Sequence, residues 1–413
     1  MGIYLNPENV DFQEVLNSKI YVDKSELIQY TNSVLRTTQK YICVSRPRRF
    51  GKSMAANMLT AYYSRGCDSR KLFQGLKIAT HPDFEKHLNQ YNVIHLNMQN
   101  FLSKTQTIEQ MIALVTKAVG RDLLRAYPDV DYLDKTILTF MLDDIYQDCQ
   151  VPFIFIIDEW DCIFRSRKNQ LEEQTKYLDF LRDLLKDKSY IALAYMTGIL
   201  PIKKYGEHSA INVFYEYSMT DASPIEEFTG FTEQEVRQLC EQYNMPFSET
   251  KKWYDGYCVD GVSIYNPKSV VEAMLRGKFS NYWTQTETYE ALKIYIQSNE
   301  FGVQDVILKL LAGEKEKIDT TTFSNDMVTF ATKDDVLTLL VHLGYLTYNA
   351  ETKEIWIPND EVMEQFISTV KVMGWGSVVT ALETSEKLLQ ATLSGDEETV
   401  AELIEQAHQA NAS

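Results

Sequence analysis

Short apolar runs alternate with helical patterns through the first half of the 413-residue chain, and this alternation is what most constrains the fold. Strands that alternate with amphipathic helices are typical of a mainly parallel, doubly wound α/β sheet. The run at 153–157 is apolar at every position, as expected of a parallel strand buried on both faces. We expect strands within 41–45, 92–98, 153–157 and 190–200, and helices at 108–124, 133–146 and 171–185, the last with an apolar stripe that begins at Leu171. Asp23 is expected to cap a short helix that carries Leu27 and Ile28.

The tripeptide Gly51-Lys52-Ser53 stands where the first of these strands gives way to a helix. The β-forming run at 41–45 ends shortly before it, and a helical pattern begins after Gly51. This strand-to-helix turn is the setting of a phosphate-binding loop, which a chance occurrence of the tripeptide would lack. The expected apolar stripe of the following helix consists of Met54, Met58, Leu59 and Tyr62.

Such a loop, the Walker A motif, wraps a phosphate with backbone amides at the N-terminus of a helix. Lys52 would reach the β- and γ-phosphate oxygens, and Ser53 would offer its hydroxyl to Mg²⁺. Arg46 replaces the glycine that usually opens the loop, which restricts the entry but leaves the amides near Gly51. We therefore expect ATP and Mg²⁺ as ligands, with Arg48 and Arg49 favoured for stabilising phosphate charge. The expected nucleotide-contacting residues are Arg46, Pro47, Arg48, Arg49, Phe50, Gly51, Lys52, Ser53 and Met54.

Two carboxylates follow the apolar run at 153–157, at the strand end where open α/β sheets bind ligands. In this Walker B position Asp158 would hold Mg²⁺ through water, together with Ser53. Glu159 would orient or deprotonate the attacking water. The alternative for Asp158 is a structural turn. Thr197, near the end of the run within 190–200, is expected to sense the γ-phosphate, the alternative being a turn before Gly198.

Successive blocks of the chain resemble the bacterial predicted AAA-ATPase-like family, from about residue 8 to the last residue. They are YVDKSELI, RPRRFGKS, IIDEWD, AYMTGILPIKKYG, WYDGY, YNPKSV and HLGYLTY with IPNDEV. In that family the arginine-rich loop is the usual form, which favours nucleotide binding despite Arg46. Members often carry a C-terminal PD-(D/E)XK nuclease domain. Because residues 380–413 contain no such motif, nuclease activity is not assigned to this chain.

The resemblance implies a P-loop NTPase core at 1–225, a helical lid at 226–295 and a winged-helix-like region at 296–413 that ends before the nuclease domain. Within the lid, Thr232 and Glu235 form the pattern of a capping box. Asn266 followed by Pro267 indicates a helix start rather than a ligand contact. For Trp253, Tyr254 and Tyr257, core packing is favoured over adenine stacking. The winged-helix expectation rests on a helix at 334–343 and strands at 345–348 and 354–357.

Charge and cysteine usage limit the partners and the compartment. With 41 Lys and Arg against 58 Asp and Glu, the net charge of −17 opposes non-specific binding of nucleic acid, which stays a weakly supported alternative. Six scattered cysteines without a CxxC pair indicate free thiols in a reducing compartment. The lack of a signal peptide or a spanning segment favours a cytoplasmic protein without membrane contact. No zinc site is expected from His81, His87 and His95.

Two functions fit these features. The first is a magnesium-dependent ATPase of slow turnover whose cycle moves the lid and the C-terminal region. The second is a nucleotide-dependent switch or interaction module with little hydrolysis, with a link to nucleic-acid processing as a weaker variant. Partners are the nucleotide and either a second copy or another protein. The segment 165–170 is expected to be a solvated loop, the alternative being an arginine that reaches a phosphate, in this subunit or a neighbouring one.

Overall fold

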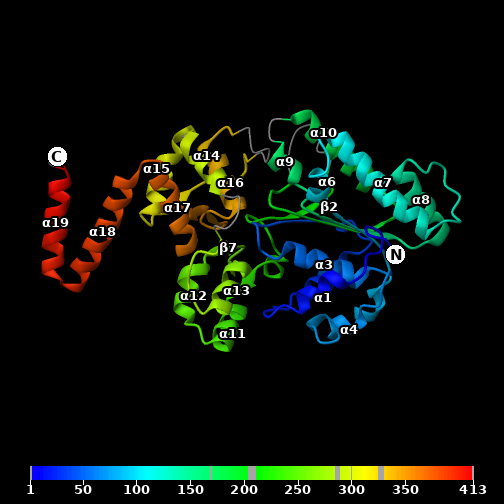
Figure 1. Ribbon diagram of the computed structural model, residues 1–413, viewed down its shortest axis with the longest axis horizontal. Coiled ribbons are helices and arrows are strands. Elements are labelled where there is room, and N and C mark those ends of the chain that lie inside the picture. The colour runs from blue at the N-terminus through cyan, green and yellow to red at the C-terminus, as the bar shows by residue number, and fades with distance from the viewer. Residues whose placement is uncertain are drawn as a thin grey trace.

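A computed structural model describes residues 2–167, 170–202, 211–283, 289–298, 300–323 and 330–411. The chain forms a core with a central parallel sheet, a region around α11 to α13, and a C-terminal region (Figure 1). In Figure 1 the helices α18 and α19 project farthest from the core. Within the described ranges, none of the helices combines the length and the apolar character needed to cross a bilayer. All six cysteines are free thiols, as expected from their spacing.

The core sheet has five strands in the order β2-β3-β4-β1-β5, and every neighbouring pair is parallel. The predicted strands are confirmed, with small differences in where they end. Because the strands are parallel, their carboxyl ends meet along one edge of the sheet. The strands are β1 (Tyr41–Ser45), β2 (Asn92–Asn97), β3 (Phe153–Asp158), β4 (Ile191–Gly198) and β5 (Tyr215–Tyr217).

Helices cover both faces of this sheet (Figure 1). The helices on one face are α1 (Val10–Leu16), α2 (Glu26–Val34) and α3 (Lys52–Tyr63), and those on the other are α7 (Ile108–Ala126), α8 (Leu138–Cys149) and α10 (Leu171–Leu185). Shorter elements connect them: α4 (Arg70–Phe73), η1 (Lys77–Thr80), α5 (Phe84–His87), α6 (Met98–Leu102) and α9 (Cys162–Ser166).

The strand β3 shows why the central run is apolar throughout. Successive side chains of a strand point to opposite faces, so Phe153, Phe155 and Ile157 pack with the helices α7, α8 and α10. Ile154 and Ile156 pack with the helices α1 to α3 on the other face. All six residues of β3 are buried.

Periodicity overestimated burial and helix length at several positions. The helix expected at 133–146 begins only at Leu138, and Leu133 is 76% exposed. The segment before α8 is a loop because carboxylates satisfy its amides: Asp144 accepts from the Leu133 amide and Asp134 from the Thr136 amide, at 2.9 and 2.7 Å. Met54 and Leu171, placed in apolar stripes, are also largely exposed.

Helix starts were predicted with mixed success. Thr232 and Glu235 form the expected capping box at the start of α11, and Asn266 caps α13 with Pro267 in its first turn. Asp23, expected to cap α2, lies two residues before the N-cap position, which Ser25 occupies. The Asp23 carboxylate instead accepts hydrogen bonds from the amides of Ser25 and Lys77, at 2.8 and 2.7 Å.

The region after the core sheet contains a small sheet that the sequence did not indicate, besides its three helices. Three antiparallel strands in the order β6-β8-β7 pack with these helices. Tyr254 and Tyr257 are buried and pack in the interior, as expected, while Trp253 is half-buried. The elements are η2 (Glu226–Phe228), β6 (Phe231–Thr232), α11 (Glu233–Tyr243), α12 (Phe247–Tyr254), β7 (Tyr257–Val259), β8 (Val262–Tyr265) and α13 (Pro267–Arg276).

The C-terminal region has the helix and β-hairpin that the sequence predicted. A third strand joins the hairpin in the order β10-β11-β9. All positions of α16 from Asp335 to Leu343 are buried. The elements are α14 (Tyr289–Ser298), η3 (Glu300–Gly302), α15 (Val303–Leu311), β9 (Glu316–Lys317), α16 (Lys333–Leu343), β10 (Thr347–Asn349), β11 (Glu354–Trp356), α17 (Asp360–Val372), α18 (Gly376–Ser394) and α19 (Glu397–Asn411).

The burial of α16 bears on the nucleic-acid alternative. A winged-helix domain that reads DNA inserts the helix before its hairpin into a groove, which requires an exposed helix face. The α16 helix has no such face, because its neighbours cover nine successive residues. In this conformation α16 is a packing element.

Candidate nucleotide site

The turn between β1 and α3 has the backbone of an anion-binding loop. The residue Gly51 directly precedes α3 and has a φ of 87°, in the left-handed region that favours glycine. This conformation places the first amides of a 12-residue helix at the end of the loop. The first amides of a helix lack carbonyl partners within it and carry partial positive charge, so they favour a bound anion.

The side chain of Lys52 is folded back onto the loop. Its Nζ donates to the carbonyl oxygens of Arg46 and Pro47, at 2.9 and 2.8 Å. The residue is only 6% exposed, and burial lowers the pKa of Lys52 although Glu159 and Asp158 oppose the shift. A buried cation bonded to neutral oxygens is stabilised by an anion that comes within reach.

The carboxylate of Asp158, the last residue of β3, contacts side chains from the start of α3 and from β4. Ser53 Oγ donates to Asp158 Oδ2 at 2.7 Å, and Thr197 Oγ1 donates to the other oxygen of the same carboxylate. Asp158 is 3% exposed and Thr197 is wholly buried. The strands β1 and β3 both pair with β4, which explains how residues more than a hundred positions apart come into contact.

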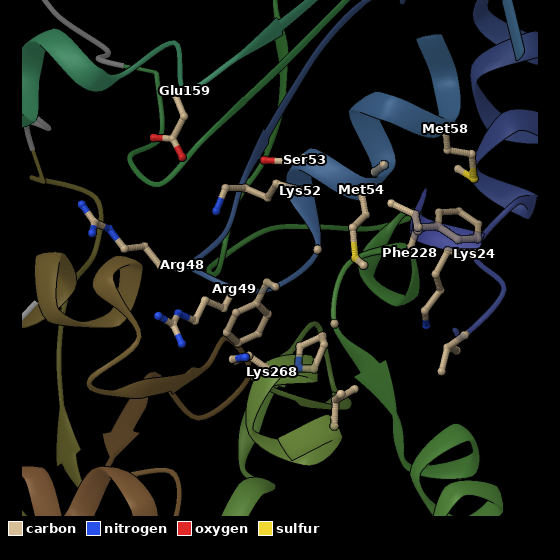
Figure 2. Close-up of a pocket in the computed structure, with 18 of the residues that line it drawn as sticks. Lys24, Arg48, Arg49, Lys52, Ser53, Met54, Met58, Glu159, Phe228 and Lys268 are labelled. Carbon is tan, nitrogen blue, oxygen red and sulfur yellow. The ribbon is translucent and has the colours of Figure 1, made fainter. Parts of the chain in front are cut away.

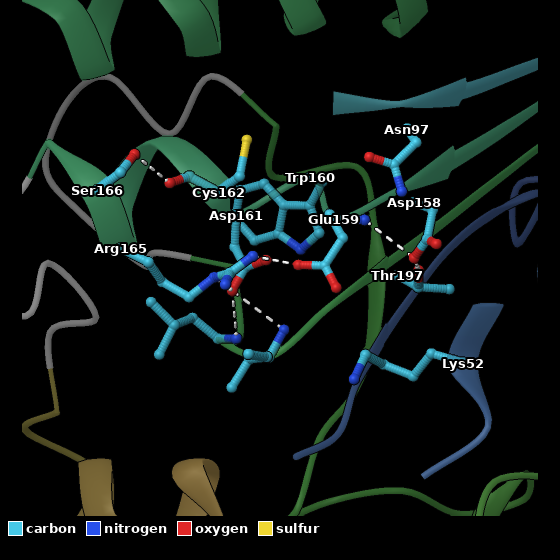
Figure 3. Close-up of polar contacts among 12 residues, drawn as sticks. Lys52, Asn97, Asp158, Glu159, Trp160, Asp161, Cys162, Arg165, Ser166 and Thr197 are labelled. Atoms are coloured by element: carbon cyan, nitrogen blue, oxygen red, sulfur yellow. Dashed lines mark hydrogen bonds and ion pairs between the residues drawn. The ribbon is translucent and has the colours of Figure 1, made fainter. Parts of the chain in front are cut away.

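The second carboxylate is held by an arginine. Glu159 has a φ of 56° and forms an ion pair with Arg165, which lies on α9 (Figure 3). The Nε of Arg165 also donates to Asp161 Oδ2 at 3.1 Å. Burial opposes the charge of Arg165, but Asp161 and Glu159 outweigh it and raise its pKa.

Sequence reasoning missed the role of Asp161, and its expectation of a solvated loop at 165–170 is wrong at Arg165. Asp161 is wholly buried and accepts hydrogen bonds from the amides of Ile199 and Leu200, at 3.0 and 2.9 Å. It therefore fixes Arg165 relative to the chain after β4. The available signal was the spacing of four residues between Asp161 and Arg165, which brings the two side chains together on one helical turn.

A cavity of about 1110 Å³ opens in front of the loop (Figure 2). In Figure 2, Lys52, Ser53 and Glu159 lie at one end, and Met58 and Phe228 lie at the other. The polar lining residues include Arg48, Arg49, Asn97, Asn100, Arg165 and Lys268. Lys24 also lines the cavity and lies beside Phe228 in Figure 2. The apolar lining residues include Phe12, Val15, Ile20, Tyr21, Val22, Met54, Met58, Phe228, Phe231 and Val271. No sequence motif marked the residues from α1 or the segment that follows it.

The expected loop contacts divide into two groups. All seven residues from Arg48 to Met54 line the cavity. Arg46 and Pro47 lie outside its wall, as do Asp158 and Thr197 behind Ser53. The Arg46 guanidinium is wholly buried and donates to the carbonyl oxygens of Ser45 and Tyr217, at 3.0 and 2.9 Å. Burial lowers its pKa to about 10.

The parallel sheet, the glycine turn before α3 and the serine–aspartate contact define a P-loop NTPase core. Residues 10–206, slightly less than half of the chain, match the family model described as Predicted AAA-ATPase. This match confirms the resemblance of the sequence blocks that lie within residues 10–206.

A curated relative and several solved structures are also similar to this chain. The "Uncharacterized protein in vnfD 5'region" of Azotobacter chroococcum mcd 1 is 23% identical over 252 residues, 59% of this chain. The match covers 47% of that protein, so the chain spans about half the length of the curated relative.

A Walker-type ATPase of Pyrococcus abyssi aligns with 83% of this chain and 94% of its own, at 12% identity and a TM-score of 0.40. The Aeropyrum pernix ORC2 protein in its ADPNP-ADP complexes aligns with 86% and 97%, at 14% identity and a TM-score of 0.35. At these TM-scores the likeness carries no inference about function.

Proposed function

We propose that this chain binds ATP with Mg²⁺ in the cavity and hydrolyses it slowly, and that the cycle moves the regions after the core. The observation that carries the proposal is the convergence of Lys52, Ser53 and Glu159 at one end of a cavity whose other end has the apolar side chains of Met58 and Phe228 beside Lys24. A ligand with a charged phosphate chain and an aromatic base fits that division of polar and apolar walls.

The wall at the apolar end favours adenine over guanine. Sites specific for guanine commonly place a carboxylate against its N1 and N2 donors. Among the described residues that line the cavity, the acidic side chain is Glu159, which lies at the polar end. Tyr21, Met58 and Phe231 offer the opposite end mainly apolar contact, which suits the adenine ring.

The residues present also suit Mg²⁺. Ser53 Oγ and the Asp158 carboxylate lie in direct contact and provide hard oxygen donors. Among the residues that the structure describes, no three His, Cys, Asp or Glu side chains form a metal-binding group. One or two protein oxygens are sufficient, since phosphate oxygens and water complete the octahedron around Mg²⁺. When bound, Mg²⁺ neutralises charge on the phosphates.

Two side chains would then act on the phosphates and the water, and two others hold carboxylates in place. Lys52 would leave the carbonyls of its own loop and neutralise phosphate oxygens, which stabilises the charge of the transition state. Glu159 would accept a hydrogen bond from the attacking water and receive its proton. Arg165 forms an ion pair with the Glu159 carboxylate. At least one Glu159 oxygen must be released from this pair to accept the hydrogen bond from the water. Thr197 positions Asp158 through its hydroxyl and reaches a phosphate only indirectly.

The ion pair between Glu159 and Arg165 also favours a second candidate, a nucleotide-dependent switch with little hydrolysis. A carboxylate oxygen that accepts from a guanidinium is less available to accept a hydrogen bond from the attacking water. If nucleotide binding leaves this pair intact, the chain would hold ATP as a signal without cleaving it.

Contacts of the proposed lid with the cavity support a moving part. Phe231, Lys268 and Val271 line the cavity from the region proposed as a lid at 226–295, while the loop belongs to the proposed core at 1–225. Nucleotide that touches both regions would favour one arrangement of them. The region 296–413 would follow through its contacts with the lid. A cytoplasmic location and a second copy or another protein as partner belong to the same proposal.

The test measures nucleotide binding and phosphate release for the native chain, Lys52→Ala and Glu159→Gln. We expect Lys52→Ala to lose binding, and Glu159→Gln to bind Mg-ATP with native affinity and release no phosphate. A native chain that binds but releases no phosphate would support the switch. A native chain that binds neither ATP nor ADP would refute the proposal. Adding DNA to the assay at low salt tests the nucleic-acid alternative, which predicts a change in rate.

A further inference from the structure

The phosphate loop is also in contact with the regions that follow the core. The amide of Gly230 donates to the carbonyl oxygen of Phe50 at 2.9 Å. The Phe50 ring packs edge-on against the Tyr257 ring, with centroids 5.2 Å apart. The loop is therefore in contact with both ends of the proposed lid's small sheet, at β6 and at β7.

The C-terminal region touches the same loop. A Cβ added at Gly344, which follows α16, would lie 2.8 Å from Cβ of Pro47 and 3.0 Å from its Cγ. Tyr257 Oη donates to the Gly344 carbonyl oxygen at 2.9 Å. The ring of Tyr257 thus packs on the loop. Its hydroxyl holds Gly344, the residue that lies against Pro47.

Arg46 extends this contact at the loop entry. Its guanidinium is buried away from the cavity and lies close enough to His342 on α16 that burial and this charge together lower the pKa of His342 to about 3. The hydrogen bonds of this guanidinium go to the carbonyl oxygens of Ser45 and Tyr217, so it stays outside the cavity wall.

We infer that Tyr257 and Gly344 are positioning residues for nucleotide binding, which hold the phosphate loop so that its amides and Lys52 match a diphosphate. The inference rests on the proposed nucleotide site and extends it to residues that touch no ligand. A loop held by fewer contacts samples more conformations, so a smaller fraction of molecules has the loop in the conformation that binds nucleotide. The apparent Kd rises in proportion as this fraction falls. By the reciprocity of linked equilibria, a bound nucleotide would favour the docked arrangement of lid and C-terminal region.

The experiment compares Tyr257→Phe with Tyr254→Phe. Both remove one buried tyrosine hydroxyl bonded to a main-chain carbonyl, since Tyr254 Oη donates to the Ser280 carbonyl oxygen at 3.0 Å. The second bond lies away from the loop, so it controls for a general loss of stability. Titration calorimetry would give the Kd for Mg-ADP and for AMP, well below the melting temperature of each variant.

We expect Tyr257→Phe to weaken Mg-ADP binding about fivefold, the effect of one net hydrogen bond, and Tyr254→Phe to leave it unchanged. AMP lacks the phosphate that the loop holds, so its affinity should be the same in all three proteins. Equal Mg-ADP affinities in the native chain and Tyr257→Phe would overturn the inference and leave the proposed function standing. A native chain without Mg-ADP binding would refute both.

A second pair of variants tests the Pro47 contact. Gly344→Ala would strain a backbone with φ of +87° and collide with Pro47, whereas Gly313→Ala has a similar φ of +81° with open space around its Cβ. The two variants share the backbone strain and any fall in melting temperature that it causes. We expect only Gly344→Ala to raise the Kd for Mg-ADP. If Gly313→Ala raises it equally, backbone strain explains the effect and the inference fails.

Discussion

Replacing Asp161 by alanine should destabilise the core more than any exposed carboxylate substitution. The Asp161 carboxylate is wholly buried and accepts from the amides of Ile199 and Leu200 and from Nε of Arg165. Alanine leaves two buried amides without an acceptor and removes one of the two carboxylates that balance a buried guanidinium. Each unsatisfied amide costs about 1–3 kcal/mol, and removing one member of a buried ion pair about 3–5 kcal/mol.

Because Arg165 keeps Glu159, the lower ends of both ranges apply, and we expect a loss of about 5 kcal/mol in the free energy of unfolding. For a unit of this size, ~1 kcal/mol shifts the melting temperature by about 2–4 °C, so the core should melt about 10–20 °C lower. Asp161→Asn keeps the shape and one acceptor oxygen, so its loss should be intermediate.

Differential scanning calorimetry with Trp160 fluorescence would follow the unfolding of this part of the core. The matched control is Asp144→Ala, since the half-buried Asp144 carboxylate accepts a hydrogen bond from one amide, that of Leu133, at 2.9 Å. We expect the control to melt within about 3 °C of the native chain. If Asp161→Ala melts as close to the native chain as the control does, Asp161 is not the anchor of Arg165.

Three further outcomes are expected. Thr197→Val, which removes only the hydroxyl that donates to Asp158, should bind Mg-ATP normally and release phosphate at least about tenfold more slowly; native turnover would refute a role for that bond. Met54→Ser should weaken ATP about threefold at unchanged melting temperature, because Met54 lines the cavity and is 45% exposed; unchanged affinity would exclude it from the base site. Burial raises the pKa of Glu361 from 4.5 to about 7, so the unfolded chain loses this proton first and stability falls between these two pH values, by up to about 3 kcal/mol. Glu361→Gln should flatten the pH dependence of the melting temperature between pH 5 and 8, and equal slopes would contradict this origin.

The sheet was predictable because its signals are local. A run such as Phe153 to Ile157 is apolar at every position only when both faces are covered, and helices must connect parallel strands. The glycine turn before Lys52 and the acids after β3 follow from the same topology, since parallel strands end along one edge.

The remaining parts depend on contacts between distant segments. Nothing near Tyr21 or Phe231 indicates that both line one cavity, because they are brought together only by packing of the later regions on the core. Arg46 was expected at the nucleotide because of its neighbours in sequence, yet its side chain leaves the loop on the opposite side. Side-chain direction at a loop entry is set by which pocket can bury it.

The buried helix α16 limits how the C-terminal region can respond to nucleotide. Its apolar residues are Val336, Leu337, Leu339, Leu340, Val341 and Leu343. Exposing each of these side chains to water costs about 1.5–3 kcal/mol. The cost of exposing the whole helix would therefore exceed the free energy of unfolding of an average domain. A working cycle must therefore move the C-terminal region as a rigid body that keeps α16 buried, or transfer α16 directly to another apolar surface. Conformations that expose α16 to water would be populated too rarely to take part in the cycle.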